Sequence, residues 1–340
     1  MLENQLINSL ILFPFFLYVS ILISKKLNIT DEPNIRKIHN TKIVNVSGLV
    51  VYIFLAFAVS VTEFSSIFEN IIISGFLVVL IGFIDDRFTL NPSTKLLLLI
   101  LPTVYLILNG FELKDLGRYE YIDVIQLGKF SLIFTLLSVI LLINAINYID
   151  GTDGLVIGYA LTAFSYFYFL SEQNNNYLQV IIIFIYFLVI CLFFNFLPSS
   201  SGLKTFVGDA GSLFIGFFVS FTMIFLYKYQ NIHPAFLIWS CWFPIYDFLY
   251  VTYNRIKYRI DFSKPDKSHF HHDILNYFFN NHFKTFLFVN SINVIVIIIG
   301  YLVCLIIGKI YSLVLFAALF IPFVYFRLIF KNLLKKQNYN

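Results

Sequence analysis

Long apolar runs separated by short polar segments make up most of this chain. Eleven runs approach the roughly 20 residues that a helix needs to cross about 30 Å of hydrocarbon. They lie near residues 6–24, 44–62, 68–84, 95–109, 130–146, 155–171, 177–196, 211–227, 235–253, 285–307 and 310–328. The pattern predicts an all-α, polytopic integral membrane protein with about 11 transmembrane helices, in which residues 1–340 form a single transmembrane domain.

One polar segment has a different periodicity. Apolar and polar positions alternate within residues 110–129, around Tyr119, Tyr121 and Val124. A period of two is typical of a β-strand, so we expect a short hairpin between the fourth and fifth runs.

The composition agrees with a membrane protein and excludes a soluble domain. Hydrophobic residues make up 59% of the chain and charged residues only 12%. Cys191, Cys241 and Cys304 all fall inside apolar runs, so we expect buried thiols and no disulfide framework. The first run has no basic segment before it and no cleavage site after it, which predicts a retained span.

The distribution of Lys and Arg predicts the orientation, because cytosolic loops carry the excess of these residues. With the N-terminus outside and eleven spans, 18 of the 23 Lys and Arg residues fall on the inner side. This arrangement places the C-terminus in the cytosol. The expected cytosolic catalytic loops are about 25–43, 85–94, 147–154, 197–210 and 254–284.

Five carboxylates lie at or beside the ends of apolar runs, all on the predicted cytosolic side. They are Asp85, Asp86, Asp150, Asp153 and Asp209. An ionised group near hydrocarbon is costly, so this cluster indicates a functional site, and we expect a metal-assisted reaction there. A membrane transporter is the competing class, but its ionisable groups would lie near the middle of the bilayer, in repeated halves with broken helices.

Asp85 and Asp86 end the third run and precede Arg87. Adjacent residues on a helix point about 100° apart, so the two carboxylates should face different partners. One would meet a metal or a basic group while the other faces the substrate. The simpler interpretation is a polar end of the span, in which Asp86 pairs with Arg87.

The segment from Asn144 to Leu155 joins the fifth and sixth runs. Asn147, Asp150 and Asp153 are spaced three residues apart, so a helix that continued through them would align them on one face. Mg²⁺ prefers carboxylate and amide oxygens, with water and substrate phosphate completing its shell. Asp-Gly turns are the simpler interpretation, but turns need no asparagines in the preceding run.

Gly208-Asp209-Ala-Gly-Ser leads into the eighth run. An Asp at a helix start often caps free N–H groups, and this is the simpler interpretation. Glycine-rich backbone at a helix N-terminus also binds phosphate, and Asp209 would then hold Mg²⁺ against that phosphate. Both roles fit one site for a nucleotide diphosphate.

Three histidines, His269, His271 and His272, follow a basic segment that begins at Arg255. Their spacing fits no usual zinc module, and no cysteines accompany them. The five Lys and Arg residues from 255 to 267 favour an anionic ligand. Ordinary positive-inside charge is the simpler interpretation, but it does not explain the histidines.

The first inner loop contains Arg36, Lys37 and His39. These residues would contact a lipid phosphate or anchor the chain to anionic headgroups. His233 falls on the outer side, and we interpret His282 as a bystander.

Taken together, these residues resemble the motifs of the polyprenyl-phosphate sugar-1-phosphate transferases, the MraY and WecA type of glycosyltransferase family 4. Five motifs occur in matching order. They are D-x-P-x-x-R-K-x-H at 31–39, the aspartate pair at 85–86, N-x-x-D-G-x-D-G-L at 147–155, G-D-x-G-S at 208–212 and H-x-H-H at 269–272. The last motif is closer to the branch that uses UDP-N-acetylhexosamines than to the peptidoglycan branch. Segment 44–48 departs from the family because it lacks the usual proline and paired glycines.

The resemblance implies that a sugar 1-phosphate passes from a UDP-sugar to undecaprenyl phosphate, with release of UMP. N-acetylglucosamine or a related N-acetylhexosamine is the expected sugar, and N-acetylfucosamine or N-acetylquinovosamine is the alternative. The product would begin a lipid-linked cell-surface polysaccharide at the cytosolic face of the bacterial inner membrane. The implied partners are the two substrates and the lipid bilayer; a homodimer fits the family, and nucleic acid has no role.

The resemblance also implies a role for each polar residue. Mg²⁺, or Mn²⁺ in its place, would be held by Asp209 and Asn147. Asp85 or Asp86 would orient or deprotonate the lipid phosphate, while Asp150 and Asp153 would hold the nucleotide or support other site residues. The implied substrate-binding residues are Arg36, Lys37, His39, Asn144, Gly208, Arg255, His269, His271 and His272.

Overall fold

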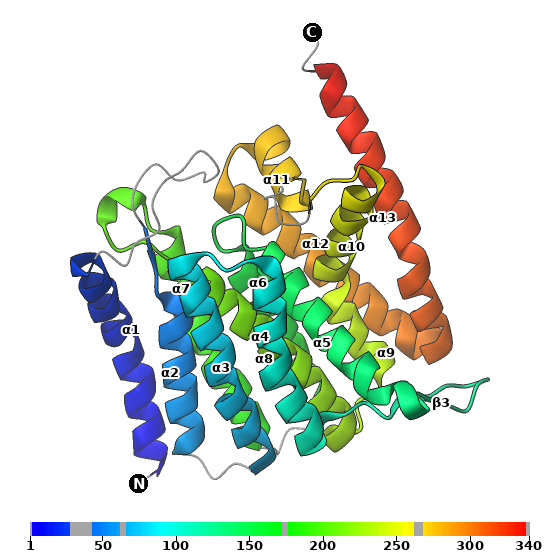
Figure 1. Cartoon of the computed structure of the whole chain (residues 1–340), viewed down its shortest axis with the longest axis horizontal. Helices are drawn as coiled ribbons and strands as arrows, with labels where there is room; N and C mark the ends of the chain where they lie inside the picture. Colours follow the sequence, from blue (N-terminus) through cyan, green and yellow to red (C-terminus); the bar gives the residue numbers. More distant parts are fainter. Residues whose placement is uncertain (1, 28–42, 62–65, 172–175, 262–267, 338–340) are drawn as a thin grey trace.

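The computed structural model describes residues 2–27, 43–61, 66–171, 176–261 and 268–337. Within these ranges the chain forms a bundle of helices with two short pairs of strands (Figure 1). The long helices are α1 (Leu2–Lys26), α2 (Ser47–Ser60), α3 (Ser66–Phe88), α4 (Pro92–Leu106), α5 (Ser131–Tyr148), α6 (Leu155–Leu170), α7 (Asn176–Phe196), α8 (Gly208–Gln230), α10 (Trp242–Lys257), α12 (His282–Ile306) and α13 (Lys309–Gln337). Two short helices, α9 (Pro234–Leu237) and α11 (Phe270–Ile274), complete the α-helical set in these ranges.

The apolar runs of the sequence coincide with these helices. Nine helical segments in the described ranges are long and apolar enough to cross a membrane. The other two runs form α2 and α6, which have 14 and 16 residues. The all-α polytopic fold is therefore confirmed, while the count of eleven crossings stays a prediction. Helix α1 begins at one end of the bundle and α13 ends at the other, as an odd number of crossings requires (Figure 1).

Helix α8 forms the centre of the bundle, and 17 of its 23 residues are buried. Aromatic rings fill the space around it. Phe214 and Phe218 stack with ring centroids 5.6 Å apart, and Phe164 of α6 stacks on Phe218 at 5.0 Å. The outer helices α12 and α13 instead expose many large apolar side chains. Such an extensive apolar surface indicates contact with lipid.

Glycines let α2 and α3 approach the start of α8 closely. A Cβ atom on Gly82 of α3 would lie 2.4 Å from the Cα atom of Ala210, and one on Gly48 of α2 would lie 2.2 Å from the Cα atom of Gly211. Small residues at helix crossings are the usual way in which membrane helices pack closely. These crossings bring the polar end of α3 beside Asp209.

A short parallel strand pair joins two segments that are far apart in the sequence. Strand β1 (Val44–Asn45) pairs with β4 (Thr205–Phe206), so the chain before α2 lies beside the chain before α8. The Oγ1 atom of Thr205 donates to the carbonyl oxygen of Val44 at 2.8 Å, and the Oγ atom of Ser47 donates to that of Phe206 at 2.8 Å. This pairing fixes the approach to the first turn of α8.

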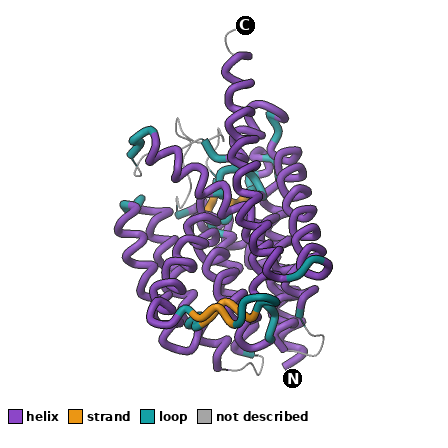
Figure 2. The backbone as a smooth tube through the Cα atoms, turned by 90° about the vertical axis from the view of Figure 1, so that its right-hand side faces the viewer, coloured by secondary structure: helices purple, strands orange, loops and turns teal. Residues whose placement is uncertain are grey.

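The predicted hairpin is present at the other end of the bundle. Strands β2 (Asp115–Arg118) and β3 (Val124–Gln126) pair antiparallel, near the end at which the N-terminus lies (Figure 2). Two π-helical turns, Ile107–Phe111 and Leu275–Phe279, and three 3₁₀ segments, Gly128–Phe130, Ser199–Ser201 and Ile238–Cys241, connect other elements.

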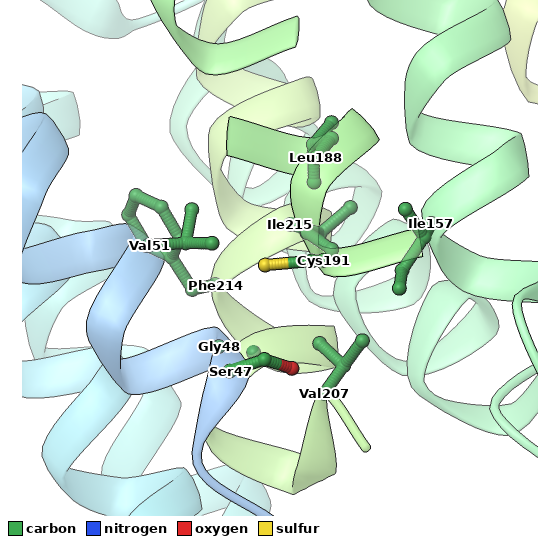
Figure 3. Close-up of a pocket in the computed structure, with 10 residues that line it drawn as sticks. Ser47, Gly48, Val51, Ile157, Leu188, Cys191, Val207, Phe214 and Ile215 are labelled. Carbon is green, nitrogen blue, oxygen red and sulfur yellow. The ribbon is translucent and has the colours of Figure 1, made fainter. Parts of the chain in front are cut away.

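A small cavity lies between α2, α6, α7 and α8 (Figure 3). Its lining is mainly apolar and includes Val51, Ile157 and Cys191. Cys191, like the other two cysteines, is free and buried, which confirms the prediction of buried thiols without disulfides. The lining carries no charged side chain.

Candidate active site

The ends of α3, α4, α5 and α8 meet at one end of the bundle around the ammonium group of Lys95. Its Nζ atom lies 2.6 Å from Oδ2 of Asp85, 3.4 Å from Oδ1 of Asp209 and 3.2 Å from Oδ1 of Asn147. Four residues from four helices therefore form one polar cluster. Both predicted metal ligands, Asp209 and Asn147, therefore contact the ammonium group of Lys95.

Asn147 is also bonded directly to the start of α8. Its Nδ2 atom donates to Oδ1 of Asp209 at 2.5 Å and to Oγ of Ser212 at 2.8 Å. The amide thus spans Lys95 on one side and α8 on the other. This double role explains why an asparagine is useful at the end of an apolar run, where an unpaired amide would be costly.

Asp86 caps α8 from a neighbouring helix. Its carboxylate accepts the backbone N–H of Asp209 at 3.1 Å and that of Ala210 at 3.2 Å, and Nδ2 of Asn45 donates to it at 3.2 Å. Gly208 has a positive φ of 69°, and a Cβ there would lie 2.7 Å from Oδ2 of Asp86. In this structure the helix start that we expected to bind phosphate is therefore bonded to a carboxylate of the chain itself.

The two adjacent aspartates do face different partners, as predicted. Asp85 pairs with Lys95 and accepts the backbone N–H of Leu90 at 2.6 Å, whereas Asp86 faces α8. Neither arrangement is the simple polar end of a span that was the alternative interpretation.

The loop after α5 does not continue as a helix. The helix ends at Tyr148, so the spacing of three residues does not align Asp150 and Asp153 with Asn147 on one face. Our expectation of a shared helical face was wrong, because the two Asp-Gly steps favour turns. Asp153 instead pairs with the ammonium group of Lys204.

His282 contacts Asp153, although we interpreted it from the sequence as a bystander. The backbone N–H of Asp153 donates to Nδ1 of His282 at 3.3 Å, and that nitrogen lies 3.6 Å from Oδ1 of Asp153. His282 is the first residue of α12. The structure thus places His282 beside a candidate site residue, and its role stays a prediction; the contact crosses 129 residues of sequence and leaves no local pattern.

Asp150 lies among the other acidic residues. Solvent reaches part of its side chain, yet the surrounding protein removes enough water to raise the pKa of Asp150 to about 8. The charges of Asp209 and Asp86 add to this rise in the pKa. The carboxyl group is therefore largely protonated near neutral pH in the free protein, and a bound cation would favour its ionised form.

Residues 269–272, which we call the histidine loop and which include the start of α11, pack against the loop after α5. A Cβ on Gly151 would lie 2.3 Å from Nε2 of His271 and 2.9 Å from Cε1 of His272, so any larger residue there would displace the histidine rings. His271 is fully buried, and neither of its ring nitrogens has a hydrogen-bond partner. Burial, together with the neighbouring His272 and His269, lowers the pKa of His271 well below its ordinary value. A neutral imidazole has one hydrogen-bond donor and one acceptor, and neither is used by His271 in this structure.

His269 is bonded to the buried carboxylate of Asp247. Its Nδ1 atom lies 2.7 Å from Oδ2 of Asp247, and Arg327 pairs with the other carboxylate oxygen of Asp247 at 2.6 Å. The side chains of Asp247 and Arg327 are fully buried. Neither residue was assigned to the site from the sequence.

The structure also locates two further predicted residues, Asn144 and Arg255. Asn144 donates to the carbonyl oxygen of Ile140 in its own helix at 2.7 Å. Arg255 is buried near the end of α10. The remaining predictions, Arg36, Lys37 and His39, lie outside the described residues.

Sequence reasoning missed Lys95, Asp247 and Arg327 as members of the polar clusters. All three lie inside apolar runs, near residues 95–109, 235–253 and 310–328. An ionisable residue within a membrane span is itself a sign of function, and this signal was present in the sequence.

The chemistry of the central cluster fits a divalent cation. Asp85, Asp209 and Asn147 present three oxygen atoms to the Lys95 ammonium group, so this set already holds one positive charge. Among the described residues, no group of three or more His, Cys, Asp and Glu side chains is arranged as a ready metal site. Two protein oxygens completed by substrate phosphate are the arrangement that Mg²⁺ commonly uses.

Comparison with known proteins agrees with the motifs. The profile of glycosyl transferase family 4 matches residues 68–227, which include the whole central cluster. An undecaprenyl-phosphate alpha-N-acetylglucosaminyl 1-phosphate transferase of Yersinia pestis is 29% identical, over 81% of this chain and 77% of the relative. The enzyme of the same description from Escherichia coli K12 is 27% identical, over 80% and 76%.

A third relative, from Bacillus subtilis, is described as a probable undecaprenyl-phosphate N-acetylglucosaminyl 1-phosphate transferase. It is 26% identical, over 81% of this chain and 79% of the relative. The matches cover most of every chain compared. The family match over residues 68–227 and the similarity to these three transferases support the resemblance to glycosyl transferase family 4 that the motifs of this membrane protein indicate.

Proposed function

We propose that this chain transfers N-acetylglucosamine 1-phosphate from UDP-N-acetylglucosamine to undecaprenyl phosphate and releases UMP. The similarity to transferases with this sugar and this lipid acceptor supports the choice of substrates. The observation that carries the proposal is the convergence of Asp85, Asn147 and Asp209 on Lys95, at the ends of four membrane helices. A lipid phosphate at the membrane surface and a soluble nucleotide can both reach such a place.

The reaction forms one phosphorus–oxygen bond and breaks another. An oxygen of the lipid phosphate attacks the β-phosphorus of the UDP-sugar, and the bond from that phosphorus to the bridging oxygen breaks, so that UMP leaves. Phosphoryl transfer depends mainly on charge neutralisation and alignment. The Lys95 ammonium group is placed to neutralise phosphate charge, because it already bridges three oxygens of the cluster.

Asp209 and Asn147 would hold Mg²⁺, which when bound would neutralise charge on the donor diphosphate. The two members of the aspartate pair then have separate tasks. Asp86 holds the start of α8, and so positions Asp209. Asp85 faces Lys95 and is placed to orient the lipid phosphate or to accept its proton.

The histidine loop and the loop after α5 would bind the donor. The buried, unpaired ring nitrogens of His271 and the side chain of Asp150 belong to these two segments, which meet at Gly151. The excess of Lys and Arg in the loops at this end favours a cytosolic location, where UDP-sugars are made available. A bacterial inner membrane and a homodimeric assembly are the corresponding expectations for location and assembly.

A donor panel tests the proposed function directly. The purified protein would be mixed with undecaprenyl phosphate, Mg²⁺ and one of several UDP-sugars, including N-acetylglucosamine, N-acetylfucosamine and N-acetylquinovosamine derivatives. We expect lipid-linked product and UMP in equal amounts, with the N-acetylglucosamine donor most active. Removal of Mg²⁺ by EDTA should stop the reaction. Absence of product with every donor would reject the transferase function.

Asp209→Asn is the matched inactive variant. It should lower turnover by about 1000-fold, because the loss of a charge-stabilising group at a transferring phosphate has effects of this order. Insertion into the membrane should be normal. Near-normal turnover with Mg²⁺ would remove Asp209 from the metal shell.

We also propose direct attack by the lipid phosphate, without a phosphorylated enzyme. Incubation with donor labelled with ³²P at the β-phosphate, in the absence of the lipid acceptor, should leave the protein unlabelled. A ³²P-labelled protein would instead indicate a double displacement through one of the aspartates.

A further inference from the structure

A buried ionic cluster lies beneath the histidine loop, apart from the Lys95 cluster. It consists of Arg327 on α13, Asp247 on α10 and Asp273 on α11, which are 0%, 0% and 6% exposed. The three residues come from segments up to 80 positions apart in the sequence. Charged groups so deeply buried are costly unless every charge is paired.

Arg327 connects three segments of the chain. Its Nη1 atom donates to Oδ1 of Asp247 at 2.6 Å and its Nη2 atom to Oδ2 of Asp273 at 3.0 Å. Nη2 also donates to the carbonyl oxygen of Ser268, immediately before the histidines. The guanidinium group lies 4.5 Å from the centroid of the Tyr250 ring. Lysine could not reproduce this planar set of contacts.

Asp247 links Arg327 to His269, the first of the three histidines. Its Oδ2 atom accepts a hydrogen bond from Nδ1 of His269 at 2.7 Å, and its Oδ1 atom accepts the backbone N–H of Phe270 at 2.9 Å. A carboxylate only accepts, so the proton of the imidazole lies on Nδ1. The Nε2 atom is then the ring nitrogen that remains available for another partner, and its direction is fixed.

Stability does not require such a cluster. Replacing a buried ion pair with apolar side chains of similar volume is often neutral or stabilising. The cluster instead fixes the geometry of a loop whose histidines pack on Gly151, in the loop after α5. The last helix of the chain thereby becomes part of the framework of the site.

We propose that Arg327 and Asp247 are positioning residues for the donor, acting through His269. The inference rests on the proposed transferase function, because it assigns the histidine loop to the UDP-sugar. Loss of either residue leaves the central cluster intact but lets the imidazole and the loop move. Binding of the donor and turnover then suffer, while the lipid acceptor binds as before.

The test compares Arg327→Gln and Asp247→Asn with the wild type in steady-state kinetics, with UDP-N-acetylglucosamine and undecaprenyl phosphate varied separately. We expect kcat/KM for the donor to fall about 100-fold, the loss that follows when a positioned group moves by about 1 Å. The donor KM should rise and the acceptor KM should stay unchanged. Lys309→Gln, at the other end of the same helix, is the matched control and should behave as the wild type.

The split between the two KM values separates positioning from folding. A variant that merely folds poorly has less active enzyme, so its apparent kcat falls while both KM values stay at the wild-type level. That result, or an unchanged donor kcat/KM, would overturn the proposal. If Arg327→Gln yields no folded protein, the nearly isosteric Asp247→Asn decides the question, because it keeps both oxygen-sized positions of the side chain.

A double variant tests whether the two residues act together. Asp247→Asn with Arg327→Gln should lose less activity than the product of the two single losses, because contacting residues couple. Independent, multiplicative losses would contradict the proposed shared role. If the wild type itself forms no lipid-linked product, the proposed function fails and these comparisons do not arise.

Discussion

Asp86 on α3 accepts a hydrogen bond from the backbone N–H of Asp209 at the start of α8, at 3.1 Å. The bond joins residues 123 positions apart and couples two aspartates of the central cluster. It also assigns the adjacent aspartates different tasks. Asp86 supports the helix that carries the expected metal ligand, while Asp85 faces Lys95.

Removal of this cap should destabilise the protein as well as inactivate it. Asp86→Ala should lose about 1–2 kcal/mol of stability, the usual effect of losing a helix cap. Thermal unfolding in detergent and turnover measure the two effects. Asp85→Asn is the control, since it leaves the α8 cap intact; it should lose turnover with a smaller change in unfolding temperature. Equal losses of stability in both variants would contradict the assigned cap.

Lys95→Gln should lower turnover about 100-fold or more, because one preorganised charge at a transferring phosphate has effects of this size. The variant leaves Asp85 and Asp209 without the cation that now bridges them. Added Mg²⁺ should therefore raise its unfolding temperature more than that of the wild type. Lys129→Gln serves as the control, because Lys129 lies in the 3₁₀ segment just before α5, away from the end of α5 that carries Asn147. Activity near the wild-type level would show that the ammonium group is dispensable.

The raised pKa of Asp150 predicts a specific dependence of stability on pH. The ordinary pKa of 3.8 rises to about 8 in the folded protein. The folded state therefore binds this proton more tightly, so the contribution to stability is full below pH 4 and is lost as the pH rises through 8. Asp150→Asn cannot ionise and should keep its stability over this range.

Unfolding temperatures at pH 5, 7 and 9 in detergent without metal would test this expectation. The advantage of Asp150→Asn over the wild type should grow with pH. Asp123→Asn, on the hairpin at the other end of the bundle, provides the control for a lost carboxylate. Parallel curves for the wild type and Asp150→Asn would disprove the shift in pKa.

His282 should contribute to activity by holding Asp153. His282→Phe removes the acceptor for the Asp153 backbone N–H, and kcat/KM should fall about fivefold, which corresponds to one hydrogen bond of about 1 kcal/mol. His282→Asn places an oxygen near the position of Nδ1 and should retain most of the activity. If both variants match the wild type, His282 is a bystander after all.

The local pattern of the sequence was sufficient to predict the helices and the hairpin. Apolar runs and alternation act over a few residues, so the spans and the pair β2–β3 could be predicted without tertiary contacts. The motifs around Asp85, Asn147 and Asp209 could likewise be recognised, because each lies within a short segment.

The tertiary structure alone decided which side chains meet. Lys95 contacts a residue 52 positions away, and Arg327 contacts Asp247 across 80 positions. Such pairings depend on how helices cross, for example at Gly82 and Ala210, and no local periodicity encodes a crossing. Because α5 ends at Tyr148, Asp150 and Asp153 do not share a helical face with Asn147, as their spacing would give in a continuous helix. The sequence determined which segments enter the membrane, because the hydropathy of a segment depends only on its own residues. The packing of the helices determined which partner each charged side chain has.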